Sequence, residues 1–406
     1  MTDATGVAAV RSRTRTLAAI LASTLGVGLM FGFQPPLLAL ILERRGAASA
    51  EIGLITGVSS VAVILFGPLY PYLIGRIGLK RALVAGIALA MVFQELMPLL
   101  PTLTAWFVLR FLTGCVLGLT WIASEVWMNR ISDDASRSSV MATYGTVFAA
   151  GVVAGPLVLQ LTGTTGLLPF HAGVVCLGLT LLPMLLLRDD PAPTPQASHP
   201  GHLLRLLGAA PVVMLAAMVA GLVESTDISL LPVFGLASGM DERASLMLVT
   251  AFLAGNVVLQ LPVGRIADRW GRRHALAVCA AAGVAGPLLL KPALASTLLL
   301  WPLLLVWGGT MYGFYTQGIA FLGETFAAED LAGANTVFVM VYCVGGMLGP
   351  ALGGVAMDLW RPLGLVAFLS IAAALLLLGL LWPPAAARAR KPGAAPEPDP
   401  DPRYRE

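Results

Sequence analysis

Apolar stretches of about 20 residues recur along almost the whole chain, and no other feature restricts its fold as strongly. Backbone polar groups in lipid need internal partners, so spanning segments are helices or strands of a closed barrel. Barrel strands alternate in polarity and these stretches do not, which leaves helices. The sequence predicts an all-α membrane protein with twelve transmembrane helices, at 17–42, 50–73, 82–100, 103–126, 138–161, 167–187, 208–234, 244–263, 275–290, 297–323, 333–357 and 362–382.

The composition and the missing motifs exclude several functional classes. Only 12% of the residues are charged, against about 25% in soluble proteins, and a net charge of +3 gives no reason to expect a nucleic-acid partner. The four cysteines fall inside predicted spans without metal or redox spacing. No phosphate-binding G-x-x-x-x-G-K-[ST] loop, triad or paired-acid constellation occurs. We therefore expect neither an enzyme nor an ATP-driven pump, and no metal or cofactor.

A polar, proline-rich linker at 188–207 divides the chain into two halves of six predicted spans each, at 17–187 and 208–382. Residues 1–16 form a polar tail with three arginines. Residues 383–406 are rich in proline, alanine and charge, a composition typical of disorder. The span at 275–290 is short for a full crossing.

The 25 lysines and arginines are distributed unequally between the two sides of the predicted membrane. If the N-terminal tail is cytosolic, 19 of them lie in cytosolic segments and Arg110 lies within a span; the outside loops hold Arg44, Arg45, Arg243, Lys291 and Arg361. Cytosolic loops of membrane proteins carry such an excess. The pattern predicts a multi-pass protein of the inner (plasma) membrane with both termini in the cytoplasm.

The two halves carry matching elements six spans apart. GRIGLKR (75–81) follows the second span and DRWGRR (268–273) follows the eighth. YGTVFAAGVVAGP (144–156) lies in the fifth span and FVMVYCVGGMLGP (338–350) in the eleventh. Repeated halves are typical of transporters that work by alternating access, with the substrate site between the repeats. We expect two pseudo-symmetric six-helix bundles.

The loop motifs resemble those of the major facilitator superfamily, and the resemblance covers about residues 15–385. The family signature G-x-L-x-D-R-x-G-R-R follows the eighth span, where the matching positions are Gly264, Asp268, Arg269, Gly271, Arg272 and Arg273. The copy after the second span keeps Arg76 and Gly78, but Gly75 stands at the position of the aspartate. Arg110 begins the R-x-x-x-G signature of the fourth helix. The resemblance implies a transporter acting as a monomer, whose first, fourth, seventh and tenth helices line a central cavity.

The glycine-rich signature that antiporters of this family carry in the fifth helix, G-x-x-x-G-P-x-x-G-G, lies here in the eleventh. This displacement leaves the direction of transport open. Glycines in spanning helices allow close helix contact, and the positions expected to pack in this way are Gly151, Gly155 and Pro156 in the fifth span and Gly345, Gly349, Pro350 and Gly353 in the eleventh.

In this family the loop after the eighth helix latches the cytosolic side. Asp268 can face the positive N-terminal end of the fifth helix, and the arginines can pair with Glu324. The incomplete copy of this motif after the second span has no acid of its own. Glu125 therefore remains as the expected partner of Arg76 or Arg81. The alternative is that these basic residues only follow the positive-inside rule.

Two acidic residues lie within the seventh predicted span. Glu224 and Asp227 are three residues apart, so they share a helix face. Two carboxylates at low dielectric favour retention of a proton near neutral pH, which a proton-coupled carrier requires. Alternatively the helix ends early at Pro232, which leaves both acids at the outer surface.

Arg110 lies ~10 Å deep in the fourth helix. We expect Arg110 to stabilise one carboxylate while Glu224 carries the proton. The alternative for Arg110 is that its side chain snorkels to the lipid headgroups.

Two glutamines are candidates for the cavity wall. Gln34 precedes Pro35 and Pro36, which are expected to interrupt the first helix, and broken helices expose polar backbone to substrate. A packing kink is the alternative. Gln317 in the tenth span is the second candidate.

The sequence as a whole predicts a secondary active transporter that exports a small organic solute by alternating access, coupled to protons. A downhill facilitator or importer is one alternative, since neither would need the acids of the seventh span to titrate. A membrane receptor or scaffold that no longer transports is the other.

Overall fold

The computed structural model describes residues 2–132, 137–187, 206–326 and 328–381, and this part of the chain is almost entirely helical. The N-terminal half contains α1 (Thr2–Arg44), α2 (Ser49–Phe66), α3 (Tyr70–Ile77), α4 (Leu79–Leu99), α5 (Leu103–Ile131), α6 (Arg137–Thr162) and α7 (Leu168–Leu185). The C-terminal half contains α9 (Pro211–Ala237), α10 (Glu242–Trp270), α11 (Arg272–Ala293), α12 (Thr297–Thr325), α13 (Ala328–Leu359) and α14 (Leu363–Leu381).

Within the described residues, twelve helical segments are long and apolar enough to cross a membrane, which confirms the predicted number. The second of them runs from Ser49 to Ile77 and joins α2 to α3 through a 3-10 turn at Gly67–Leu69. The ninth is α11, whose 22 residues are a full crossing. The expectation of a short helix at 275–290 was wrong because the helix already begins at the polar residue Arg272 and continues past Lys291 to Ala293.

The first helix is continuous through Pro35 and Pro36, so the predicted interruption at Gln34 was also wrong. Spanning helices tolerate proline because neighbouring helices and local adjustments satisfy the freed backbone groups. The helix begins at Thr2, so the polar segment predicted as a tail at 1–16 extends the first spanning helix. Most of the linker (188–205) and the predicted disordered tail (383–406) lie outside the described residues.

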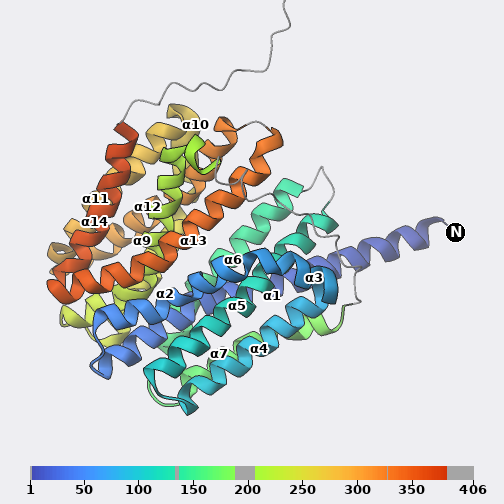
Figure 1. Cartoon of the computed structure of the whole chain (residues 1–406), viewed down its shortest axis with the longest axis horizontal. Helices are drawn as coiled ribbons and strands as arrows, with labels where there is room; N and C mark the ends of the chain where they lie inside the picture. Colours follow the sequence, from blue (N-terminus) through green and yellow to red (C-terminus); the bar gives the residue numbers. More distant parts are fainter. Residues whose placement is uncertain (1, 133–136, 188–205, 327, 382–406) are drawn as a thin grey trace, which may run out of the picture.

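The two halves form two helix bundles that lie side by side (Figure 1). Within the N-terminal half, α1 packs on α6 and α4 on α5; within the C-terminal half, α9 packs on α13 and α10 on α12. Between the halves, α2 packs along α13 and α6 along α10. One hydrophobic core runs through both halves and includes Phe33 and Trp106 on one side and Phe234 and Trp307 on the other.

The halves meet most closely at one end of the molecule. At this end, which we call the sealed end, a Cβ atom on Gly53 would lie 1.8 Å from the Pro350 carbonyl oxygen, so the two backbones touch. The sealed end carries the loops at 45–48, 163–167, 238–241 and 360–362. The opposite end, with the turns at Gly78 and Gly271, is called the open end.

The contact between α6 and α10 illustrates the difference between the ends. Nearer the sealed end, Gln160 of α6 donates a hydrogen bond to Thr250 of α10 at 3.1 Å. Nearer the open end, a Cβ atom on Gly145 of α6 or on Gly264 of α10 would meet nothing within 4 Å. These two positions are therefore unpacked at the open end, unlike the contact at Gln160.

Candidate transport cavity

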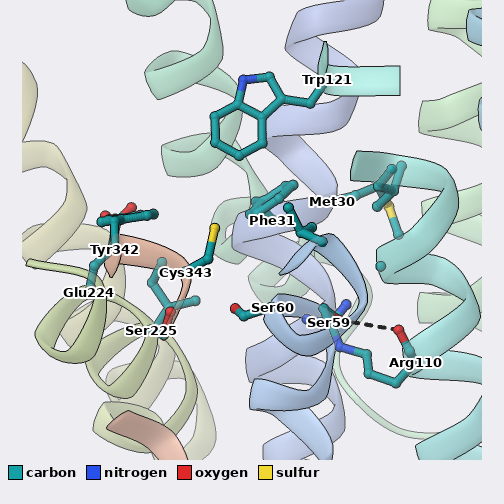
Figure 2. A pocket seen from close by; sticks show the side chains of 14 residues that line it. Met30, Phe31, Ser59, Ser60, Arg110, Trp121, Glu224, Ser225, Tyr342 and Cys343 are labelled. Atoms are coloured by element: carbon teal, nitrogen blue, oxygen red, sulfur yellow. Dashed lines mark hydrogen bonds between the residues drawn. The ribbon is translucent and has the colours of Figure 1, made fainter. Parts of the chain in front are cut away.

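A cavity of about 80 Å³ lies between the two halves. Figure 2 shows its walls, with Met30, Phe31 and Trp121 from the N-terminal half and Glu224, Tyr342 and Cys343 from the C-terminal half. The other lining residues are Ser59, Ser60, Val63, Arg110, Gly114, Leu117, Ser225 and Ile228. The space accommodates several water molecules or part of a solute.

Glu224 is the only carboxylate among the described residues that line this cavity. It lies in α9, which continues through Pro232 to Ala237, so the alternative in which the helix ends early is excluded. The hydroxyl of Tyr342 donates to one carboxylate oxygen at 2.6 Å, and that of Tyr312 donates to the other at 3.1 Å. Among the residues that the structure describes, no lysine, arginine or histidine forms an ion pair with it. The site therefore offers Glu224 two neutral donors and leaves room for a cation.

Asp227 has a different environment, although it lies only three residues further along α9. Its side chain is fully buried, and neither carboxylate oxygen has a hydrogen-bond partner within the described part of the chain. An ionised carboxylate without a partner is very costly to bury. The two acids of α9 are thus one that lines the cavity and one that is enclosed without a partner among the described residues.

Arg110 points into the N-terminal half rather than out to the headgroups. Its side chain is 6% exposed and donates to the side-chain oxygen of Gln34 and, at 3.5 Å, to the Thr56 carbonyl oxygen. The Gln34 amide in turn donates to Gln94 at 2.8 Å. This network spans α1, α2, α4 and α5. The contacts do not support snorkelling.

The expected pairing of Arg110 with an acid of α9 is not a contact in this structure. No ion pair joins its guanidinium to Glu224 or Asp227 among the described side chains, and Gln34 occupies the position of the expected carboxylate. Gln34 itself is fully buried and connects helices instead of lining the cavity. Gln317 is also buried and lies 3.4 Å from Arg272, outside the lining of this cavity.

The predicted latch residues lie at the open end. The Asp268 side chain is 72% exposed and contacts Arg272 of the next helix at 3.5 Å, and Arg272 reaches Glu324 at 3.4 Å. Gly271 and Gly78 occupy equivalent turns and both have positive φ, +85° and +87°, which a residue with a side chain rarely adopts. This shared turn explains the glycine that the two copies have in common.

The remaining latch candidates lie around these turns. Arg269 is exposed in the last turn of α10, and the Arg273 Nε donates to the Leu380 carbonyl oxygen at 3.1 Å. Arg76 lies over the Tyr72 ring, 5.8 Å from its centroid, and Glu125 is half-buried on α5. Gly264 faces open space.

The glycines expected to pack helices lie against neighbouring backbones. A Cβ atom on Gly151 would lie 2.3 Å from the Leu25 carbonyl oxygen of α1, and one on Gly155 would lie 2.4 Å from Gly32. In the other half, the shortest such distances are 2.0 Å for Gly345 and 2.3 Å for Gly349, both to α9, and 2.8 Å for Gly353, to the Thr226 side chain. Pro156 and Pro350 lie inside α6 and α13.

Several features of the cavity had no signal in the sequence. Trp121 stacks on Phe148 with 6.1 Å between the ring centroids, and Phe31 meets both rings edge-on. Tyr312 and Tyr342, the donors to Glu224, lie on α12 and α13. Spacing along one helix reveals a shared face, but a partner on another helix needs the tertiary structure. No group of three histidine, cysteine, aspartate or glutamate residues suited to a metal occurs in the described ranges.

Comparison with known proteins identifies the family. The family model described as Major Facilitator Superfamily matches residues 20–248 and 213–403. The chain belongs to the major facilitator superfamily. Membership makes it a multi-pass membrane transporter and not an enzyme.

Relatives and solved structures agree with this assignment. The chain is 24% identical to the uncharacterized MFS-type transporter YfkF of Bacillus subtilis, over 88% of this chain and 94% of YfkF. It is 22% identical to the uncharacterized MFS-type transporter YcaD of Escherichia coli, over 85% and 90%. Its fold is similar to that of a mutant of the nucleoside transporter NupG (TM-score 0.77, 15% identity, 91% and 98% covered).

A second solved structure also has this fold. It is a bacterial homologue of the human lysosomal transporter Spinster, described as inward-facing and unoccupied, with TM-score 0.73 and 15% identity, over 92% of this chain and 99% of that chain. At these identities the likeness concerns the fold alone.

Proposed function

We propose that the chain is a secondary active transporter that exports a small organic solute in exchange for protons. The observation that carries this proposal is the position of Glu224, which lines the cavity between the two halves without a cationic partner among the described residues. A proton and a solute can then compete for the same carboxylate. Such competition couples their movement if the cavity faces the two sides in turn.

The tyrosines around Glu224 support a role in proton exchange. Two hydroxyl donors stabilise the ionised carboxylate in the absence of a positive charge, and the surrounding apolar wall favours the protonated form when the cavity is dry. The balance between the two forms depends on the contents of the cavity. We assign Glu224 as the exchanging acid and Asp227 as an enclosed acid beside it.

The open end is proposed to face the cytosol. It carries the Arg-rich segment at 265–273, where α10 ends and α11 begins, and the cytosolic side of membrane proteins is enriched in such residues. The structure then represents an inward-facing state, the same state as that of the solved Spinster homologue. In the opposite state we expect Asp268 to face the N-terminal end of α6.

A single chain supplies both cavity walls, so we propose that the monomer is sufficient for transport.

The wall of the cavity favours an amphipathic solute. Phe31 and Trp121 present aromatic surface with Met30 and Leu117 beside them, while Ser60 and Ser225 add hydroxyl groups. Aromatic walls with few polar groups are typical of sites for small organic molecules. A solute dissolved in the inner leaflet or the cytosol reaches this cavity from the open end, which supports export.

Solute flux in reconstituted vesicles, with and without a pH gradient, tests the proposal. A panel of radiolabelled amphipathic amines, carboxylic acids and neutral indoles supplies the probes. We expect at least one solute to accumulate against its gradient only when the proton gradient is present. Solute flux that is the same with and without the proton gradient would indicate a facilitator. Movement of solute and protons in the same direction would indicate an importer. No flux of any solute would favour a receptor or scaffold.

A further inference from the structure

Asp358, in the last turn of α13, contacts the beginning of a helix in the other half. Its two carboxylate oxygens accept hydrogen bonds from the backbone amides of Ser49 at 2.8 Å and Ala50 at 2.9 Å. These are the first two residues of α2. One carboxylate of the C-terminal half therefore covers two free amides of the N-terminal half.

The α2 helix lacks an ordinary cap of its own. The residue at its N-cap position is Ala48, whose side chain has no oxygen to accept from the first turn. Its Glu51 accepts from the Ala48 amide at 3.0 Å but leaves the amides of Ser49 and Ala50 free. Free amides at a helix start carry partial positive charge, and a carboxylate stabilises them. Asp358 supplies that carboxylate from across the interface.

The contact exists only while the sealed end is closed. Beside it, a Cβ atom on Gly354 would lie 2.1 Å from the Ser49 carbonyl oxygen, so α13 and α2 touch through their backbones. Two ion pairs at the sealed end also join the halves, Arg361 with Glu43 and Arg44 with Glu242. Separation of the halves at this end breaks all of these contacts and leaves the amides of α2 to water.

We infer that Asp358 is a gating residue that stabilises the state described here by capping α2 from the opposite half. It mirrors the role expected of Asp268, which belongs to the same half and faces the start of α6 when the open end closes. In the transport cycle, the cap of Asp358 on α2 would then break as the cap of Asp268 on α6 forms. This inference rests on the proposed alternating-access cycle.

Distance measurements between spin labels at the sealed end test the inference. The labels are placed at Thr104→Cys and Ala295→Cys, two exposed positions in opposite halves, in full-length protein in lipid nanodiscs whose four native cysteines are replaced by alanine. Asp358→Asn should raise the fraction of molecules with separated labels about fivefold. Asp268→Asn should lower that fraction, and the double variant should return it toward the parent value.

Asp241→Asn is the matched control. Asp241 also caps a helix at the sealed end, since it accepts from the Ala244 amide at 2.7 Å, but both residues belong to α10 and its cap. It should leave the label distances unchanged, because its cap lies within one half of the molecule. Asp358→Ser serves as a second variant if the asparagine form does not accumulate.

Three results would overturn the inference. Equal distance distributions for Asp358→Asn and the parent, in a protein that still samples both states, would refute the gating role of Asp358. The proposed alternating-access cycle would still stand. Equal shifts in the Asp358 and Asp241 variants would reduce the effect to general destabilisation. A complete lack of separated labels in every protein, the parent included, would overturn the alternating-access cycle and the inference with it.

Discussion

At the scale of single residues, the chemistry of the cavity depends on which side chains have partners. Glu224 has two tyrosine donors and borders the cavity, whereas Asp227 is enclosed without a partner among the described residues and Arg110 is held by Gln34. The three candidates of the sequence therefore have three different environments. Of the two acids, only Glu224 lines the cavity in the state described.

Replacement of Tyr342 tests the environment of Glu224. Tyr342→Phe removes the 2.6 Å donor and leaves a buried acceptor with one hydrogen bond fewer. Loss of this donor disfavours the ionised form, so Glu224 should hold its proton to higher pH. We expect the pH at which solute uptake is half-maximal to move upward. Tyr315→Phe, which loses a hydroxyl from the ring 5.2 Å from Tyr342, is the control. An unchanged or lowered midpoint would contradict the assignment.

Replacement of Gln34 tests the arginine network. Gln34→Ala leaves the buried guanidinium of Arg110 without its side-chain acceptor, and loss of a hydrogen bond to a buried charge costs about 1.5–3 kcal/mol. We expect a clear fall in the melting temperature of the detergent-solubilised protein. Gln260→Ala, at an exposed position of α10, should change stability by less than about 0.5 kcal/mol. Equal effects of the two changes would contradict a structural role for the network.

At the scale of helices, small residues decide where the halves can touch. Gly53 and Gly354 allow α2 and α13 to meet backbone to backbone near the sealed end. On α6 and α10, Gly145 and Gly264 face open space at the other end. Glycines at both ends of the interface suit a molecule in which either end can close.

Alanine at these glycines should act differently at the two ends. In Gly354→Ala the new Cβ atom would lie 2.1 Å from the Ser49 backbone, and such overpacking costs about 1–3 kcal/mol. We expect the sealed end to open more often, which a membrane-impermeant thiol reagent added only on the side of the sealed end would report as faster labelling of Cys343 in the cavity wall. Gly145→Ala has no atom within 4 Å and should not accelerate labelling. Similar labelling rates in the two variants would contradict the assignment of the closed end.

At the scale of the whole molecule, the architecture could be predicted from the sequence because it depends on periodic, local features. Apolar runs marked the twelve spans. The i,i+3 spacing predicted that Glu224 and Asp227 share a face, but only Glu224 lines the cavity. The partners could not be predicted, because Gln34 meets Arg110 across 76 positions and Asp358 meets Ser49 across 309. The continuity of α1 through Pro35 and Pro36 depends on neighbouring helices that local sequence does not specify.

Orientation in the membrane is open to a direct test. His274 is exposed at the open end and Ala295 at the sealed end. We expect a cysteine at His274 to react with a membrane-impermeant maleimide only in everted vesicles, and one at Ala295 to react in intact cells, because the Arg-rich segment at 265–273 lies at the open end. The reverse pattern would place the cavity of this structure toward the outside.

The exchange of protons for solute at Glu224 is most directly tested by proton movement in reconstituted vesicles that contain a pH-sensitive dye. A solute identified in the flux panel is added, and proton flow is recorded for the parent and for Glu224→Gln. The amide keeps the size of the side chain but cannot carry a proton, so we expect solute exchange to persist while solute-driven proton flow falls to the level of empty vesicles. Proton flow at the parent ratio in Glu224→Gln would contradict the account.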